Sequence, residues 1–137
     1  MKSTFSKTWN KSTQIRKQRK YRYNAPLHVK GSFLNVHLDA SLRKKYQTRS
    51  LRVRKGDTVK VCRGQYKGKV GKVEDVDVGY TKVMITGIHR VRKDGTKHLI
   101  PFQPSNLLIT DIATGDKKRI AKLKGGKEKP QKETKND

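Results

Sequence analysis

Apolar and polar positions alternate through the central part of the chain, and this alternation predicts several short strands. The expected strands are Thr58–Cys62, Lys69–Val78, Tyr80–Thr86, Ile88–Arg92, Thr96–Ile100 and Asn106–Thr110. Asp94-Gly95 lies between two of them, and this dipeptide favours a tight hairpin because its glycine accepts a positive φ. Consecutive short strands joined by tight turns are typical of a small β-barrel, so we expect a mainly β chain.

The same alternation separates an inner from an outer face of the predicted barrel. The side chains expected to point inward are those of Val59, Val61, Val83, Ile85, Leu107 and Ile109. The valines of residues 69–78 depart from a strict period of two, which predicts a bulge or bend near Gly71. Pro101 and Pro104 lack a backbone N–H, so we expect them to interrupt the strands.

The segments that flank the alternating part divide the chain into predicted regions. They are an extended basic arm at residues 1–38, a short helix with a linker at 39–50, the barrel at 51–112 and a basic C-terminal extension at 113–137. Within the extension we expect a short helix from about Asp116. A disordered tail is expected from residue 125, because that stretch has too few apolar residues to offset the entropy of ordering.

Local signals support the arm and the first helix. Pro26 fixes its own φ and favours an extended conformation at Ala25, so we expect an ordered, extended arm, with a floppy tail as the alternative. In DASLRKKY, residues 39–46, Asp39 can cap a helix by accepting backbone N–H bonds. Leu42 and Tyr46 are four residues apart and would share one helix face.

The charge of the chain indicates which class of partner it binds. The net charge is +24, from 35 Lys and Arg against 11 Asp and Glu, and only 31% of residues are hydrophobic. Residues 1–55 alone hold 16 basic residues against one acid. Self-repulsion of this size destabilises a free compact state, and a polyanion relieves it. Nucleic acid is therefore the favoured partner.

Membrane binding and secretion fit the residues less well. Residues 1–37 show no amphipathic periodicity, and no apolar run is long enough to cross a bilayer, so we expect no membrane insertion. The N-terminus resembles a transit peptide in composition but has no apolar stretch of the secretory kind. Cys62 is the only cysteine, which excludes an internal disulfide, and we expect it to act as a small buried hydrophobe.

No residue pattern supports catalysis. The loop at 64–69 is one residue shorter than a phosphate-binding loop, and Val70 stands where a magnesium-binding Ser or Thr is required. Glu74, Asp75 and Asp77 have no nucleophile or metal partner nearby in the sequence, and the histidines lack metal-ligand spacing. We therefore expect no enzyme activity, no metal and no cofactor.

Cations interleaved with aromatic residues and glycines predict an RNA-binding surface. In the arm, the residues expected to contact RNA are Lys17, Arg19, Lys20, Arg22, Tyr23, Asn24, His28 and Lys30. Before and within the barrel they are Arg49, Arg52, Arg54, Lys55, Arg63, Gln65, Tyr66, Lys67, Lys69 and Lys72. Turn positions are expected at Gly56, Asp57, Gly64, Gly68 and Gly71. Tyr66 is expected to offer a stacking surface, with packing on the core as the alternative.

Two levels of resemblance narrow the prediction. RKGDTVKVCRGQYKGKVGKV, residues 54–73, resembles a KOW motif, which implies a small SH3-like barrel of the kind shared by ribosomal proteins and transcription elongation factors. YNAPLHVK, LRKKYQTRSLRVRKGD and PSNLLITDI resemble the archaeal and eukaryotic branch of universal large-subunit ribosomal protein twenty-four, whose eukaryotic member is numbered twenty-six. The resemblance covers about residues 15–123, and the short turn KGKVGKV is closer to the archaeal form.

The family resemblance implies a structural protein of the cytoplasmic ribosome, with a role in translation and no homo-oligomer. It implies binding to large-subunit rRNA early in assembly, beside neighbouring ribosomal proteins and near the polypeptide exit tunnel. The nascent chain, the signal recognition particle and the protein-conducting channel are further implied partners. The alternative is a transcription elongation regulator of the KOW type that binds RNA polymerase or nucleic acid. Such factors usually carry an additional α/β domain, which residues 1–50 are too basic to form.

Overall fold

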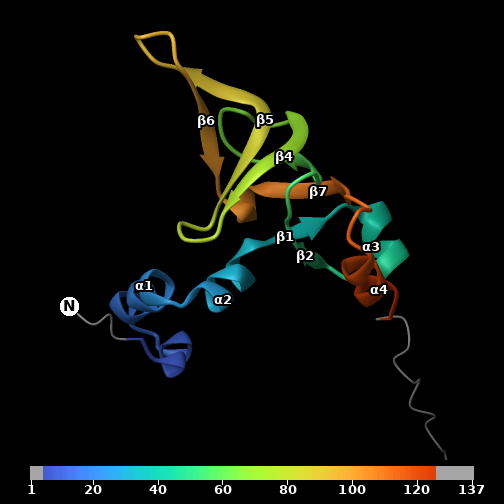
Figure 1. Ribbon diagram of the computed structural model, residues 1–137. Coiled ribbons are helices and arrows are strands. Elements are labelled where there is room, and N and C mark those ends of the chain that lie inside the picture. The colour runs from blue at the N-terminus through green and yellow to red at the C-terminus, as the bar shows by residue number, and fades with distance from the viewer. Residues whose placement is uncertain (1–4, 126–137) are drawn as a thin grey trace, which may run out of the picture.

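The computed structural model describes residues 5–125 and is organised around one curved β-sheet (Figure 1). Its strands are β1 (Asn35–Leu38), β2 (Ser50–Arg52), β3 (Thr58–Val61), β4 (Val70–Asp77), β5 (Lys82–Val91), β6 (Lys97–Phe102) and β7 (Leu107–Asp111). They form one seven-stranded sheet in the order β2-β1-β7-β3-β4-β5-β6. β1 and β7 run parallel, and the other neighbours run antiparallel. The mainly β, barrel-like class predicted from the sequence is confirmed.

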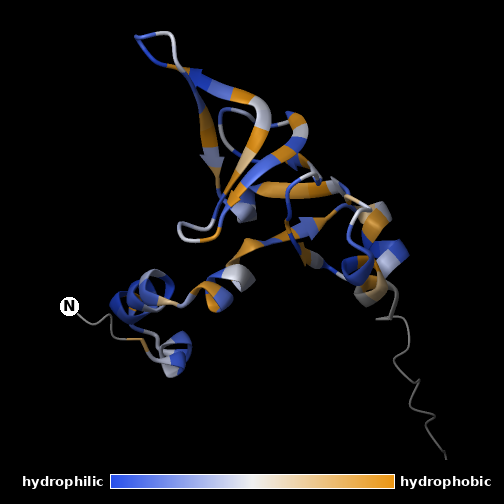
Figure 2. Ribbon diagram, viewed as in Figure 1, coloured by the Kyte–Doolittle hydropathy of each residue, from blue (hydrophilic) through white to orange (hydrophobic). Residues whose placement is uncertain are grey.

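The core of the sheet is built from the side chains that the alternation assigned to the inner face. Val59, Val61, Val83, Ile85 and Ile109 have no exposed surface. Figure 2 shows the resulting alternation of hydrophobic and hydrophilic segments along the strands. Burying each such side chain stabilises the fold by roughly 1.5–3 kcal/mol relative to leaving it in water.

The bulge predicted near Gly71 occurs in the same strand, a few residues further along. The register between β4 and β5 shifts between Val73 and Asp75, whereas Gly71 pairs regularly with Val59 of β3. A Cβ at position 71 would lie 2.6 Å from Cγ2 of Ile85, so the glycine permits a close approach of two strands. Its expected role as a turn residue is therefore wrong.

Two further strand predictions need correction. The two strands predicted at Tyr80–Thr86 and Ile88–Arg92 are one long strand, β5, which begins at Lys82 and ends at Val91, so Tyr80 and Thr81 lie in the preceding turn. The register of β5 with β6 shifts between Met84 and His89. Pro101 does not interrupt β6 but pairs with Met84 inside it. Because β6 is the edge strand, the missing N–H of the proline costs no hydrogen bond to a further strand.

β1 and β2 were not predicted: β1 falls in the expected arm, and β2 lies where the expected linker meets the barrel. They contain four and three residues, which is too short for alternation to be recognised. In β1, Val36 and Leu38 are fully buried, and the strand lies between β2 and β7. The N-terminal part of the chain is thereby joined to the barrel by the sheet itself.

The predicted extended arm is helical over much of its length. Its helical segments are η1 (Lys7–Lys11), α1 (Ile15–Asn24), α2 (Leu27–Lys30) and η2 (Gly31–Leu34). Arg, Lys and Gln are good helix formers, and the ring of Tyr21 supplies anchorage by packing 5.3 Å from that of Phe5 and 5.9 Å from that of Phe33. Ala25 is extended, as Pro26 predicts, and separates α1 from α2.

The two remaining helices, α3 (Ala40–Tyr46) and α4 (Lys117–Gly125), lie where the sequence predicts helices. Leu42 and Tyr46 both pack against the core from α3. The carboxylate of Asp39 accepts a hydrogen bond from the Ser41 hydroxyl at 3.1 Å, in place of the predicted bond from a helix N–H. The tail predicted from residue 125 falls on residues 126–137, outside the described part.

Candidate nucleic-acid interface

A groove of about 1010 Å³ runs between α1 and the turn that joins β4 to β5. It collects several of the predicted RNA contacts from the arm, namely Arg19, Lys20, Arg22, Tyr23, Asn24 and Lys30. Arg19 and Tyr23 are four residues apart and share one helix face, so the helix presents cation and ring to the same space. None of the described residues that line the groove is acidic. We refer to this feature as the arm groove.

Contacts across the arm groove hold its two walls together. Lys30 Nζ donates a hydrogen bond to the carbonyl oxygen of Gly79 at 2.9 Å and lies 6.0 Å from the ring centroid of Tyr23. The Arg22 guanidinium lies 5.6 Å from the ring centroid of Phe33, which keeps the charge on the groove side of α1. Two segments that are about fifty residues apart in the sequence therefore form one basic surface. Lys17 and His28 are exposed but do not line the groove.

The loop between β3 and β4 carries a second group of predicted contacts. Gly64 and Gly68 have φ values of +90° and +88°, which the tight turn requires. Gly68 N–H donates to the carbonyl oxygen of Val61 at 2.8 Å and closes the loop. The exposed side chains that surround it are those of Arg63, Gln65, Lys67, Lys69 and Lys72.

Tyr66 differs from its neighbours in this loop. Its ring is half-buried and packs edge-on against Phe102, with ring centroids 6.0 Å apart. The Lys69 ammonium lies 5.3 Å from the Tyr66 centroid. Packing on the core, the alternative that the sequence left open for this residue, is what the structure shows. The ring therefore presents less surface to a partner than a free loop tip would.

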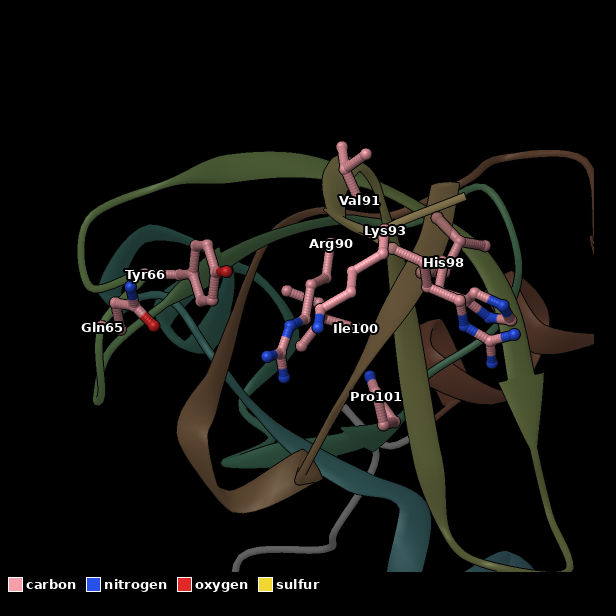
Figure 3. Close-up of a pocket in the computed structure, with 10 residues that line it drawn as sticks. Gln65, Tyr66, Arg90, Val91, Lys93, His98, Ile100 and Pro101 are labelled. Carbon is pink, nitrogen blue, oxygen red and sulfur yellow. The ribbon is translucent and has the colours of Figure 1, made fainter. Parts of the chain in front are cut away.

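A second groove, of about 1020 Å³, adjoins this loop (Figure 3). Gln65 and Tyr66 line it together with Arg90, Lys93 and His98 of the hairpin formed by β5 and β6. Sequence reasoning did not include these three basic residues, because they lie more than twenty positions from the loop. The strand register brings two of these residues together, since Arg90 pairs directly with His98.

The basic cluster before the barrel is partly engaged inside the protein. The Arg54 guanidinium pairs with Asp116 at the start of α4. The Arg52 guanidinium lies against buried Gly31, where an added Cβ would come within 2.6 Å of it. Arg49 and Lys55 are exposed. All four residues of this cluster are exposed, but the Arg52 and Arg54 side chains already lie against other residues of the protein.

Asp57 was predicted as a turn residue, and in the structure its side chain also accepts hydrogen bonds from three separate residues in the interior. It is fully buried, and its carboxylate accepts backbone N–H bonds from Arg54 at 2.8 Å and Ala113 at 3.0 Å. Two further bonds come from Arg119, whose guanidinium donates to both carboxylate oxygens at 2.7 and 2.8 Å. Such a two-bonded pair fixes geometry as well as charge.

Arg119 also donates to the carbonyl oxygen of Arg52 at 2.9 Å, so it joins α4 to β2 and to the turn before β3. The sequence offered one weak signal for this residue. On α4, Arg119 precedes Leu123 by four positions, so the two share a face, and Leu123 is buried in the core. We call Asp57 and Arg119 the buried ion pair; it fastens the C-terminal extension to the barrel.

The described part of the chain gives no support to other kinds of site. Residues 5–125 contain no group of three or more His, Cys, Asp or Glu side chains placed to hold a metal ion. No helix in the same range combines the length and the apolar character needed to span a bilayer.

Comparison with known proteins supplies an independent observation. The profile of the family described as ribosomal proteins L26 (eukaryotic) and L24p (archaeal) matches residues 12–125. The chain is 50% identical over 112 residues to the large ribosomal subunit protein uL24 of Methanocorpusculum labreanum, covering 82% of this chain and 93% of the relative. It is 49% identical over 112 residues to the protein of that name from Methanocella arvoryzae, covering 82% and 90%. The protein of that name from Methanoregula boonei is 45% identical over 117 residues, covering 85% and 96%.

Proposed function

The chain belongs to the family of eukaryotic L26 and archaeal L24p ribosomal proteins, and from that membership we propose that it is a structural protein of the large ribosomal subunit that binds large-subunit rRNA. The proposal places it in the cytoplasmic ribosome, among neighbouring ribosomal proteins, with a part in early subunit assembly. It also includes a position near the polypeptide exit tunnel. There, the nascent chain, the signal recognition particle and the protein-conducting channel would come within reach.

The arm groove is the observation that carries rRNA binding. Four cations, Arg19, Lys20, Arg22 and Lys30, line it without any acidic side chain among its described lining residues. Each cation that neutralises a phosphate releases condensed counterions, and this release drives binding. Arginine can in addition bind a phosphate through two parallel bonds. The helix and the Lys30 bridge hold these charges in place before RNA arrives, so less ordering entropy opposes binding.

The loop between β3 and β4 supplies the second surface in this proposal. Its cations, Arg63, Lys67, Lys69 and Lys72, surround a turn whose glycine backbone can approach phosphate oxygens closely. Arg90, Lys93 and His98 extend this surface across the second groove. In this arrangement the barrel docks on folded RNA while the arm groove binds a neighbouring segment.

The salt dependence of rRNA binding tests the arm groove. Arg19→Ala combined with Arg22→Ala removes two phosphate contacts, so the slope of log affinity against log salt should flatten by about 0.7–0.9 per contact. Fluorescence anisotropy with a labelled large-subunit rRNA fragment, measured over a series of KCl concentrations, gives the slope.

Lys44→Ala combined with Lys45→Ala is the matched control, because it removes two exposed charges from α3, outside the groove. We expect the control slope to change by less than half as much. Equal slopes for the two double variants would remove the arm groove from the mechanism. Failure of the wild-type chain to remain with large subunits after a high-salt wash would count against the ribosomal role as a whole.

A further inference from the structure

Two tyrosines that line the arm groove are much more exposed to solvent than the other described tyrosines. Tyr23 of α1 and Tyr80 of the turn between β4 and β5 expose 79% and 77% of their surface, and both line the groove. Tyr21, Tyr46 and Tyr66 are half-buried against other side chains. Packing within the described part of the fold therefore accounts for those three rings but not for Tyr23 and Tyr80.

The segments that carry the two rings are fixed by backbone and side-chain contacts. The N–H of Tyr80 donates to Oδ1 of Asp77 at 3.0 Å, and the next residue, Thr81, has a φ of +54°. Few residues other than glycine adopt that conformation, so it marks a tightly specified turn. Lys30 links the turn to Tyr23, because its ammonium lies near the ring of Tyr23 and donates to the carbonyl oxygen next to Tyr80. Lys30 thus connects the helix that carries Tyr23 to the turn that carries Tyr80.

The chemistry of this pairing selects one form of RNA. In a duplex, the faces of the bases are covered by their neighbours, so the cations can contact phosphates but the tyrosines find no base to stack on. In a single strand, each base offers a free face, and aromatic side chains bind it with little regard to sequence. A groove that combines Arg19, Lys20 and Arg22 with two exposed rings matches phosphate and base together.

We propose that the arm groove binds an unpaired RNA segment, with bases stacked on Tyr23 and Tyr80 and the phosphates beside them held by the cations of α1. This inference rests on the proposed function and deepens it, because it states which form of rRNA the groove takes. It also adds Tyr80, which the sequence pattern assigned to a strand, to the binding surface.

Binding of the full-length chain to three RNAs tests the inference: a large-subunit rRNA fragment, a short oligouridine, and an RNA duplex of the same length. Tyr23→Ala combined with Tyr80→Ala should weaken oligouridine binding about twenty-five-fold or more, since stacking contributes at least about fivefold per base and the variant removes two rings. The same variant should change duplex binding less than twofold. Tyr23→Phe combined with Tyr80→Phe keeps both rings and should bind oligouridine as the wild type does. Circular dichroism checks that all variants fold, which exposed positions favour.

Cross-linking provides a readout that does not depend on affinity. Ultraviolet irradiation of the wild-type complex with oligouridine should attach uridine to the peptides that contain Tyr23 or Tyr80, as mapped by mass spectrometry. Equal binding of oligouridine by the wild type and the alanine variant, or equal losses for oligouridine and duplex, would overturn the stacking role and leave rRNA binding intact. If the wild type does not bind the rRNA fragment at all, the proposed function fails, and this inference fails with it.

Discussion

Replacing Arg119 with methionine should destabilise the barrel far more than the same replacement at Arg54. Both arginines pair with an aspartate, but their surroundings differ. The side chains of Arg119 and Asp57 are 5% and 0% exposed, whereas those of Arg54 and Asp116 are 54% and 31% exposed. Methionine matches the length of the arginine stem, so the change mainly removes the charge and its hydrogen bonds.

The magnitude follows from what the substitution leaves behind. Without Arg119, the Asp57 carboxylate stays buried with two backbone N–H donors, and the carbonyl oxygen of Arg52 loses a bond as well. Removing one partner of a buried pair typically costs about 3–5 kcal/mol, because the remaining charge is uncompensated. An exposed pair such as Arg54 with Asp116 contributes about 0–1 kcal/mol. Since a domain of this size is stable by about 5–15 kcal/mol, the first loss is large.

Thermal and urea unfolding, followed by circular dichroism, measure the difference. We would work in about 1 M salt, where the screening length is about 3 Å and self-repulsion of the basic chain is suppressed. Each kcal/mol lowers the melting temperature of a small domain by about 4–8 °C, so Arg119→Met should lower it by roughly 12 °C or more. Arg54→Met should shift it by only a few degrees. The double variant Asp57→Asn with Arg119→Met removes the unpaired charge. It should not recover the full loss, because the single Asn oxygen cannot accept both backbone N–H groups that Asp57 accepts.

Similar melting temperatures for Arg119→Met and Arg54→Met would refute this reasoning. They would mean that water or a rearranged side chain compensates the carboxylate, and that the buried ion pair does not fasten the extension to the barrel.

Two further predictions concern one position in a strand and one in a hairpin turn. Gly71→Ala should destabilise the barrel by roughly 1–3 kcal/mol, because its Cβ would lie 2.6 Å from Ile85 Cγ2; Gly115→Ala, which meets no atom within 4 Å, is the control in the same unfolding assay. The Thr96 hydroxyl, and then its N–H, lower the pKa of Asp94 below the ordinary 3.8. The charged form therefore stabilises the hairpin above that pH, and the stabilisation is lost as the pH falls through the lower folded-state pKa. An NMR titration of the Asp94 carboxyl with a midpoint at or above 3.8 would contradict this.

The sequence predicted those parts of the fold in which local pattern and tertiary packing agree. β3 and β7 alternate cleanly, so Val59 and Ile109 could be assigned to the core from their spacing alone. α1 could not be predicted in this way, because its residues show no apolar stripe. Its anchor is a set of ring contacts between Tyr21 and two phenylalanines elsewhere in the chain.

In the candidate site, too, the residues with a local signal were predicted and those that depend on distant contacts were missed. The cations of the arm were identified because charge is visible in the sequence, and the structure brings six of the predicted arm residues to one groove. Tyr80 was missed because its turn lies within a stretch that alternates like a strand. Arg119 was missed because its partner, Asp57, is more than sixty residues away. Residue type can be read locally, but the meeting of distant segments depends on the register of the whole sheet.

The parallel pairing of β1 with β7 has a consequence for how the molecule matures. His37 pairs with Leu108, so this contact spans about seventy residues of chain. Contacts of such separation form late, since closing the intervening loop is entropically costly until nearer elements are in place. As synthesis proceeds from the N-terminus, the cations of α1 emerge well before their supporting strand can join the sheet. We therefore expect the barrel to complete first and β1 to join it afterwards, which then sets the direction in which the arm leaves the barrel.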